Sequence, residues 1–475
     1  MRNIDHIYID GAFVKPHGTE RFPLVNPTTE EVIGHVVLAD KEDTRRAIAA
    51  ARNALPAFSR TSKAQRVAML ERLHAAVIAR SDELRDATIE EYGGPVTRAS
   101  WVSRYAAQAF LDAARTLETY EFERRVGSAT VVMEPVGVSV LITPWNSNAG
   151  SICSKLAMAI AAGCTTVIKP SELSAIQTQI VAEAFHEADL PAGVVNIVNG
   201  RGDVVGTGLS TNPDVARISF TGSTGTGKII ARQALDTMKR VSLALGGKSP
   251  TILLEDADFE TAVPAALNIA FQNNGQACIA GSRLLVPHGR LAQVVELAKA
   301  EVAGMKVGDP ADPATTIGPM ANRSQFDRVQ ACISRGLEQG ATLVAGGEGR
   351  PRGLDRGYFV KPTVFANVGN DMVIAQEEIF GPVLCIITYR DEDEAVAIAN
   401  DSAFGLHAYV FSSDTRRAQA IARRLEAGRV AINGMQHDPL APFGGYKQSG
   451  VGREFGLLGL ESFLEAKTVM TAAAA

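Results

Sequence analysis

Residues Ala216–Leu245, with the sequence ARISFTGSTGTGKIIARQALDTMKRVSLAL, decide the fold class of this chain. Two apolar runs, Ala216–Phe220 and Val241–Leu245, flank a glycine-rich turn and the helical pattern Gly225–Asp236. A strand, a helix and a second strand of this apolar character are typical of a parallel sheet covered by helices on both faces. The segment therefore predicts an α/β fold.

The same alternation extends in both directions from this segment. Further strands are predicted at Val136–Ile142, Thr166–Ile168, Val194–Val198, Leu284–Val286, Pro382–Tyr389, Ala408–Phe411 and Arg429–Asn433. Helical spacing marks Lys41–Ala57, Lys63–Arg80, Asp82–Tyr92, Ser154–Ala162 and Ser174–Ala188, so the first hundred residues are expected to be mainly helical after a short β segment. These strands are too many for one compact sheet, which predicts two parallel-sheet α/β domains.

The segment Thr119–Met133 has a different pattern, with alternating β-prone and charged residues and no helical partner. An exposed strand pair of this kind leaves an edge without hydrogen-bond partners. We therefore expect a small β arm that pairs with another subunit.

Composition narrows the class of protein. The chain has 475 residues, of which 46% are hydrophobic and 21% charged, and a net charge of -5, which argues against a nucleic-acid partner. No signal segment opens the chain, and the longest apolar stretch, Leu156–Ile168, is too short to span a membrane. Five widely spaced cysteines fit a reducing compartment and show no metal-binding spacing. A cytoplasmic enzyme or binding protein is expected.

Cys278 is the strongest candidate for a reactive side chain. It lies in the run Asn273–Arg283, NNGQACIAGSR, among small and amide residues. Backbone amides and a glycine turn could assist a thiol there, because the thiolate is the nucleophile. The alternative is a buried cysteine that packs as a small hydrophobic residue.

The glycine-rich turn after Phe220 suggests a phosphate site, because a helix N-terminus presents free amides. The run from Gly222 to Lys228 fits the spacing of a phosphate-binding loop of nucleotide triphosphatases, yet Ile229 stands where that loop needs Ser or Thr. Upstream, Gly200, Gly202 and Gly206 match the usual dinucleotide pattern only weakly. Either segment could be a plain turn between a strand and a helix.

Two more polar segments follow predicted strands. Lys169-Pro170-Ser171-Glu172 ends one strand, and a carboxylate there can accept both ribose hydroxyls of NAD and repel the extra phosphate of NADP. A proline turn with Glu in the first helical turn is the simpler explanation. Thr143-Pro144-Trp145-Asn146 ends another strand, and an Asn146 amide facing Cys278 would form an oxyanion hole.

Seven motifs in order along nearly the full length resemble the aldehyde dehydrogenase superfamily, and more closely its hydrolytic branch. They are Pro144-Trp145-Asn146, Lys169-Pro170-Ser171-Glu172, Phe220-Thr221-Gly222-Ser223, Leu245-Gly246-Gly247-Lys248, Gly275-Gln276-Ala277-Cys278, Glu378-Ile379-Phe380-Gly381-Pro382 and Pro442-Phe443-Gly444-Gly445. The resemblance implies a Rossmann-like NAD-binding domain (residues 1–116 and 136–246), a catalytic domain (247–445) and an oligomerisation arm (117–135 and 460–475) of a homodimer or homotetramer.

The resemblance also implies roles for individual residues. Cys278 attacks the aldehyde, Asn146 and the Cys278 amide hold the oxyanion, and Lys155 lies near a proton relay. Hydride passes to NAD, and water hydrolyses the resulting thioester. The implied cofactor residues are Ile142, Thr143, Pro144, Trp145, Asn146, Lys169, Ser171, Glu172, Gly202, Gly206, Phe220, Gly222, Ser223, Thr226, Leu245, Gly246, Glu378 and Phe380.

One position departs from the family pattern. The residue before Leu245-Gly246-Gly247 is a general-base glutamate in the family, and here it is Ala244, 34 positions before Cys278. Loss of a positioned base typically costs about 10²–10⁴ in rate. Either the site is inactivated, which the Leu-Gly-Gly-Lys run favours, or the acyl group passes to a thiol such as coenzyme A. A third interpretation is a catalytically silent NAD-binding protein, against which Cys278, Asn146 and Glu378 argue.

The substrate tunnel is the least constrained part of the prediction. Small residues at Ser147, Gly150 and Ser154 share one helix face and leave room for a bulky, aromatic or long-chain aldehyde, unless other side chains refill the space. By resemblance the tunnel also takes in Trp101, Ala277, Ile279 and His437. We expect no Arg or Lys at the tunnel positions, so the sequence does not support a carboxylated aldehyde.

Overall fold

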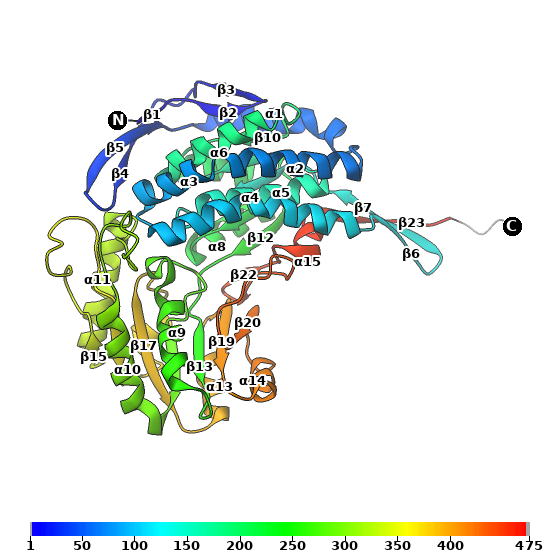
Figure 1. Cartoon of the computed structure of the whole chain (residues 1–475). Coiled ribbons are helices and arrows are strands. Elements are labelled where there is room, and N and C mark those ends of the chain that lie inside the picture. Colours follow the sequence, from blue (N-terminus) through cyan, green and yellow to red (C-terminus); the bar gives the residue numbers. More distant parts are fainter. Residues whose placement is uncertain (1, 472–475) are drawn as a thin grey trace.

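The computed structural model describes residues 2–471, and it is a mixed α/β protein with two large sheets of mainly parallel strands (Figure 1). The first sheet has the order β22-β12-β11-β8-β9-β10-β2-β3. Its five central strands are parallel, and β22, β2 and β3 pair antiparallel at the two edges. Their bounds are β2 (Ile7–Ile9), β3 (Ala12–Val14), β8 (Ser139–Ile142), β9 (Thr166–Lys169), β10 (Val195–Ile197), β11 (Arg217–Thr221), β12 (Arg240–Ala244) and β22 (Gly450–Val451).

The second sheet has the order β15-β16-β17-β14-β13-β19-β20, and only its edge strand β15 pairs antiparallel. Its strands are β13 (Pro250–Leu253), β14 (Arg283–Pro287), β15 (Thr342–Ala345), β16 (Thr363–Ala366), β17 (Val383–Tyr389), β19 (His407–Phe411) and β20 (Arg429–Ile432). Strands β8, β9, β13, β14, β16 and β19 are buried at every position, as parallel strands covered on both faces must be. The predicted fold class is confirmed.

Helices cover both sheets. With the first sheet lie α1 (Lys41–Phe58), α2 (Lys63–Ala79), α3 (Ser81–Ala87), α4 (Val96–Thr119), α5 (Asn148–Ala162), α6 (Ala175–Glu187), α7 (Thr207–Thr211), α8 (Thr224–Leu235) and α15 (Gly456–Glu461). Following the second sheet's strands are α9 (Phe259–Phe271), α10 (Leu291–Gly304), α11 (Arg323–Glu338), α12 (Val373–Gln376), α13 (Glu392–Asn400) and α14 (Thr415–Ala422). No helix among residues 2–471 is both long enough and apolar enough to cross a membrane.

Two parts of the amino-terminal region differ from the prediction. The first 37 residues contain five strands rather than one short β segment, and β1 (Arg2–Ile4), β4 (Arg21–Asn26) and β5 (Glu31–Val37) form a separate sheet. The long helix α4 was not predicted, although it packs between α2 and α5 (Figure 1). Six of its eleven buried residues are alanines, a residue of high helix propensity.

The expected strand pair near residue 125 is part of a three-stranded sheet. Strands β6 (Glu123–Val126) and β7 (Ala129–Pro135) form a hairpin, and β23 (Leu464–Val469) pairs antiparallel with β7. This arm projects from the body of the protein in Figure 1. Residues 117–119 of the predicted arm belong to α4, and residues 472–475 lie outside the described part of the chain. Pairing of the arm with another subunit stays a prediction.

Candidate active site

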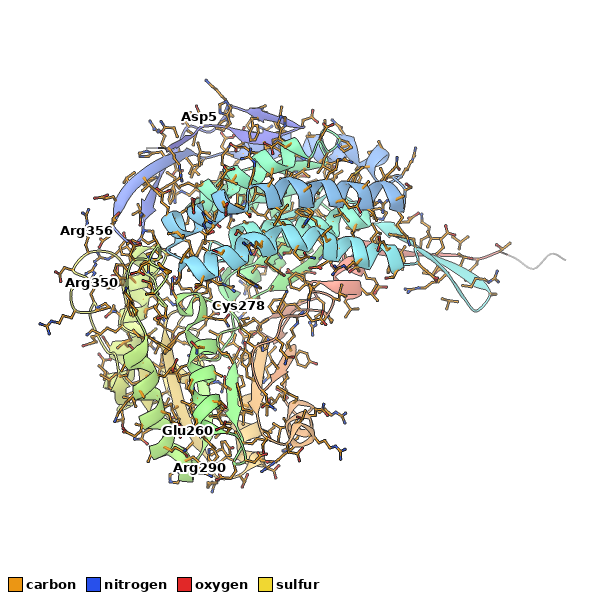
Figure 2. All side chains as sticks on the ribbon, viewed as in Figure 1. Asp5, Glu260, Cys278, Arg290, Arg350 and Arg356 are labelled. Atoms are coloured by element: carbon orange, nitrogen blue, oxygen red, sulfur yellow. The ribbon has the colours of Figure 1, made fainter. Side chains whose placement is uncertain are left out.

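A cavity of about 930 Å³ lies where the carboxyl ends of the first sheet face the loops of the second. The segments that follow β8, β11 and β12 line it on one side, with Asn146, Ser223 and Ala244 at its surface. Cys278 lines the opposite side, and Figure 2 shows this residue where the upper and lower parts of the molecule meet. The carboxyl edge of a parallel sheet is the usual place for a ligand.

The turn before Cys278 has an unusual backbone conformation. Asn273, Asn274 and Gly275 have φ angles of 54°, 60° and 71°, three left-handed residues in succession. Asparagine tolerates this region better than most residues, and position 275 requires glycine because an added Cβ would lie 2.2 Å from the carbonyl carbon of Gly381. A strained turn of this kind persists only when its surroundings hold it in place.

The amide side chains of the turn supply those surroundings. Asn273 Nδ2 donates to the backbone oxygens of Asn146 (3.1 Å) and Gln276 (3.0 Å). Asn274 Nδ2 donates to the backbone oxygen of Gly93 at 3.0 Å, and Gln276 Nε2 donates to Tyr92 Oη at 3.1 Å. These amides therefore act on the backbone and position the thiol rather than react themselves.

The thiol of Cys278 is protonated in the empty cavity. Burial raises its pKa first, and the carboxylate of Glu378 raises it further, to about 12. The backbone amides of Cys278 and Ile279 lower this pKa, but by less than burial and Glu378 raise it. The sulfur therefore needs a base, a rise in pH or a bound cation before it becomes a thiolate.

Asn146 is brought to the same cavity as Cys278. Its Nδ2 donates to the backbone oxygen of Gln276, two residues before the cysteine, at 2.9 Å. An amide nitrogen carries two hydrogens, so the second remains free for an oxygen in the cavity. The structure therefore brings Asn146 to the segment that carries the thiol, and its role as an oxyanion donor stays a prediction.

Ala244 ends β12 with its methyl group on the cavity wall. Its neighbours in the sheet are Thr221 on β11 and Gly450 on β22, and Gly222 N donates to its carbonyl oxygen at 3.1 Å. A side chain at position 244 therefore enters the same space as Cys278. An alanine there supplies no group that can accept a proton.

Lys155 lies behind the cavity wall rather than on it. Its Nζ donates to Ser219 Oγ at 2.9 Å and forms an ion pair with Glu454, whose side chain reaches the cavity. Burial lowers the pKa of Lys155, while Glu454 holds it up. Glu454 was not among the predicted site residues, and only this contact with Lys155 reveals it.

The predicted cofactor residues fall into two groups along the carboxyl edge of the first sheet. Those that line the cavity are Pro144, Trp145, Asn146, Gly222, Ser223, Leu245, Gly246, Glu378 and Phe380. The others, Ile142, Thr143, Lys169, Ser171, Glu172, Gly202, Gly206, Phe220 and Thr226, lie outside the cavity wall, at or after the ends of β8, β9, β10 and β11. The strand pairings place Ile142 beside both Lys169 and Phe220.

The cofactor residues outside the cavity wall include a pair of opposite charges and glycines whose backbone is open. Lys169 Nζ lies 3.5 Å from Glu172 Oε2, and a Cβ added to Gly206 would lie 3.9 Å from Lys169 Cδ. A Cβ on Gly202 would meet no atom within 4 Å, so the backbone there is open. Ser223 caps the N-terminus of α8 by accepting from Thr226 N at 3.3 Å. Free amides at such a helix end suit a phosphate.

All predicted tunnel residues line the cavity. They are Trp101, Ser147, Gly150, Ser154, Ala277, Ile279 and His437. Tyr105 partly refills the space opposite the small residues, because a Cβ on Gly150 would lie 3.6 Å from its ring. Its ring stacks on Trp101, and His437 approaches it edge-on with 5.0 Å between centroids. This end of the cavity is therefore aromatic.

The expectation of no cationic residue in the tunnel is wrong. Arg98 and Arg429 both line the cavity. Arg98 lies on the same face of α4 as Trp101 and Tyr105, because residues three and four positions apart are neighbours on a helix. This helix was not predicted. Arg429 is far away in the chain and arrives on β20.

The sequence pattern described as the Aldehyde dehydrogenase family matches residues 13–469. The chain belongs to the aldehyde dehydrogenase family. It is 47% identical over 99% of both chains to a 3-succinoylsemialdehyde-pyridine dehydrogenase from a Pseudomonas species. A putative aldehyde dehydrogenase from Staphylococcus saprophyticus is 46% identical over the same shares.

Solved structures agree with this assignment. A mutant of Aldehyde Dehydrogenase C from Pseudomonas syringae, in complex with NAD+ and octanal, superposes with a TM-score of 0.98 at 46% identity, covering 99% of this chain and 98% of that one. An aldehyde dehydrogenase from Mycobacterium tuberculosis in complex with NAD+ gives a TM-score of 0.96 at 38% identity, with the same coverage.

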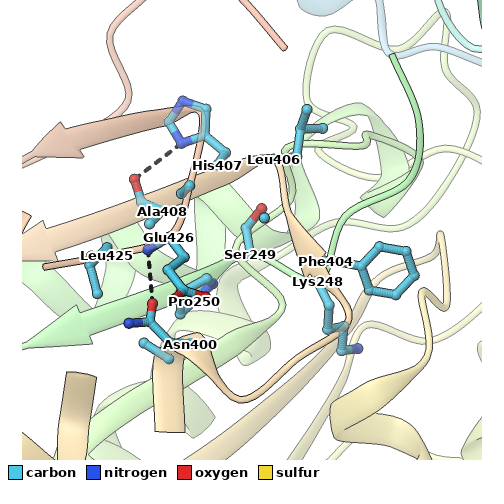
Figure 3. Close-up of a pocket in the computed structure, with 13 residues that line it drawn as sticks. Lys248, Ser249, Pro250, Asn400, Phe404, Leu406, His407, Ala408, Leu425 and Glu426 are labelled. Carbon is cyan, nitrogen blue, oxygen red and sulfur yellow. Dashed lines mark hydrogen bonds between the residues drawn. The ribbon is translucent and has the colours of Figure 1, made fainter. Parts of the chain in front are cut away.

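A second, small cavity lies behind the main one in this aldehyde dehydrogenase (Figure 3). Its volume of about 10 Å³ leaves room for at most one water molecule. His407 lines both cavities, and its Nδ1 lies 3.1 Å from the backbone oxygen of Ala408, so Nδ1 carries the hydrogen. Burial lowers the pKa of His407 to about 4, and the imidazole is therefore neutral.

Proposed function

We propose that this enzyme oxidises a bulky aldehyde, aromatic or long-chain, to the carboxylic acid with NAD as hydride acceptor. The observation that carries the proposal is that Cys278 and Asn146 line one cavity with the predicted nicotinamide-side residues Glu378 and Phe380. An aldehyde carbonyl in this cavity can meet a nucleophile, an oxyanion donor and a hydride acceptor together.

The residues present fit NAD. The helix N-terminus at Ser223 suits a pyrophosphate, and the open backbone at Gly202 and Gly206 lies beside Lys169 and Glu172, a pair suited to ribose hydroxyls. Glu172 favours NAD over NADP, because a carboxylate repels a second phosphate. The Pseudomonas syringae and Mycobacterium tuberculosis relatives were crystallised with NAD+, which supports the same choice.

The protein's own groups account for the remaining chemistry. The sulfur of Cys278 adds to the carbonyl carbon as its proton leaves, and the new oxyanion accepts hydrogen bonds from Asn146 Nδ2 and the Cys278 amide. When bound, NAD accepts the hydride from that carbon. The oxyanion then collapses to a thioester on Cys278. Water adds to the thioester, expels the thiol and releases the acid.

Ala244 makes two of these steps slow. Deprotonation of the thiol and of the attacking water both require a base, and position 244 supplies none. We therefore propose poor turnover at an otherwise complete site. The alanine also favours a second candidate, transfer of the acyl group to an incoming thiol such as coenzyme A, because a thiol needs no activated water.

Mass spectrometry of the chain after exposure to NAD and an aldehyde tests these proposals. A dehydrogenase that cannot activate water accumulates an acyl adduct on Cys278. Release of that adduct by coenzyme A but not by buffer would establish the acyl-transfer candidate. No adduct at any pH would contradict dehydrogenation and favour a silent NAD-binding protein.

The assembly and compartment are also part of the proposal. The β6–β7 hairpin carries four exposed residues along β6, Glu123–Val126, whose outer edge is open to a strand of another subunit. We propose a homodimer or homotetramer built through this arm. All five cysteines are free thiols, which supports a cytoplasmic, reducing location.

A further inference from the structure

Arg98 differs from the other two arginines of the cavity, Arg328 and Arg429, which both donate to backbone oxygens. Among residues 2–471 its guanidinium makes no hydrogen bond and no ion pair, and its Nε is buried without a partner. The guanidinium carbon lies 4.6 Å from the centroid of the Trp101 ring. An aromatic face attracts the cation but satisfies none of its five N–H donors.

The acidic groups of the cavity are engaged elsewhere. Glu454 pairs with Lys155, and Glu378 accepts a hydrogen bond from Gly247 N at 3.0 Å. Outside the cavity, Asp112 Oδ1 accepts from Gln108 and pairs with Arg115, while its Oδ2 is buried without a partner. No carboxylate of the described residues therefore neutralises Arg98.

A second positive charge lies at the same aromatic end. Arg429 donates to the backbone oxygens of Pro442, Asp438 and Ala441, so its hydrogen bonds are satisfied but its charge is not. Burial raises the pKa of the Tyr105 hydroxyl and lowers the pKa of His437; both guanidiniums lower these two pKa values, and Asp112 acts in the opposite direction on both. The aromatic end of the cavity thus holds two guanidiniums, and Arg98 is the one without a hydrogen-bond partner among the described residues.

We propose that Arg98 binds a carboxylate at the end of the substrate remote from the aldehyde, so that this enzyme acts on carboxylated aldehydes. Arg98 presents the forked donors that match a carboxylate, and Trp101 and Tyr105 stack beside it to hold an apolar linker between the two ends. The proposal rests on the oxidation proposed above and names the class of aldehyde that it accepts.

Matched aldehydes test the assignment by kinetics. 4-Carboxybenzaldehyde and 4-methylbenzaldehyde differ only at the remote end, and their kcat/KM ratio is measured by NADH formation in the Ala244→Glu protein. Arg98→Leu should lower the ratio by roughly 10- to 100-fold, the range for a charge-assisted hydrogen bond. Arg98→Lys keeps the charge without the fork and should give an intermediate ratio.

Arg104→Leu is the matched control. Arg104 is exposed on the same helix, does not line the cavity, and its loss changes the net charge equally. The control should leave the ratio unchanged. A ratio that Arg98→Leu does not lower, or that Arg104→Leu lowers as much, overturns the proposal. A further result would also overturn the proposal: Arg98→Leu lowers the kcat/KM ratio of pyridine-3-carbaldehyde to benzaldehyde by the same factor. Arg98 would then recognise a neutral hydrogen-bond acceptor rather than a carboxylate.

Binding to the unsubstituted chain keeps the test independent of turnover. The chain has two tryptophans, Trp101 and Trp145, and both line the cavity, so their fluorescence reports its occupancy. With NAD present, terephthalate should bind at least tenfold more tightly than 4-methylbenzoate, and Arg98→Leu should remove the difference. Equal affinities refute the role of Arg98. A different result would refute only the proposed oxidation: terephthalate binds more tightly, but aldehydes give neither NADH nor an adduct on Cys278. The carboxylate role of Arg98 would then stand.

Discussion

Replacing Ala244 by glutamate is the most informative change that the structure offers. The methyl group already faces the cavity at the end of β12, and the backbone there is held by Gly222 N and by pairing with Thr221 and Gly450. A longer side chain extends into the cavity and requires no rearrangement of the sheet. The neighbouring charge of Glu378 should raise the pKa of the new carboxylate toward the range where it serves as a base.

The expected gain follows from the state of the thiol. With a pKa of about 12, only about one Cys278 sulfur in 10⁴ is ionised at pH 8. A base within reach can recover part of that factor, and positioned bases typically contribute about 10²–10⁴ in rate. We therefore expect Ala244→Glu to raise kcat/KM by about 100-fold or more, which corresponds to about 2.7 kcal/mol of transition-state stabilisation.

Steady-state NADH formation at pH 8 with a bulky aldehyde measures this gain. Ala244→Gln is the matched control, because it has nearly the same volume and polarity but accepts no proton at this pH. It should remain within about threefold of the unsubstituted chain, since surface and volume changes alone have small effects. If glutamate raises the rate less than tenfold, or if glutamine raises it equally, the reasoning about position 244 is refuted.

Further predictions concern other parts of the site. Asn146→Ala should lower kcat/KM by roughly 100-fold by removing an oxyanion donor, measured in the glutamate-restored protein, and an unchanged value would exclude that role. In the unsubstituted chain, alkylation of Cys278 by iodoacetamide should accelerate about tenfold per pH unit from pH 7 to 10, because the reactive thiolate accumulates as pH rises toward a pKa of about 12; a plateau below pH 9 would contradict it. Glu172→Ser should shift the NADP to NAD preference by roughly tenfold toward NADP, and no shift in the kcat/KM ratio would place the ribose elsewhere. Lys155→Met should lower the free energy of unfolding by about 3 kcal/mol in a urea titration, because it leaves the Glu454 carboxylate without its buried partner; Lys155→Arg should lose less.

The parts of the fold that were predictable are those with a strong local signal. The βαβ segment around Gly225 combines apolar strands, a glycine turn and a helical period, and it appears as β11, α8 and β12. Helix α4 has a helical period as well, carried mainly by small alanine side chains, and the prediction missed it. The family resemblance placed residues 460–475 in the arm. The hairpin's own pattern could not, because β23 lies more than 300 residues after β7 and pairing over that range depends on tertiary packing.

The site shows the same division. Asn146 follows a strand that the sequence identifies, so its place at the sheet edge followed from topology. Cys278 follows α9, which was not predicted, and only the structure shows Asn146 bonded to the segment that carries it. Glu454 was missed because a single carboxylate near the end of a chain has no distinguishing pattern. Arg98 was missed because its distinguishing feature is the lack of a hydrogen-bond partner among the described residues. Only the folded structure shows that lack.

The strained turn at Asn273, Asn274 and Gly275 bears on how position 244 should be interpreted. The turn is held by bonds to Gly93, Tyr92 and Asn146, none of which involves β12. The geometry of Cys278 is therefore independent of the side chain at position 244. With alanine at position 244, Cys278 and Asn146 still line one cavity, and Asn146 Nδ2 donates to the backbone oxygen of Gln276. If turnover is limited by the missing proton acceptor, as proposed, restoring that acceptor alone should restore the chemistry.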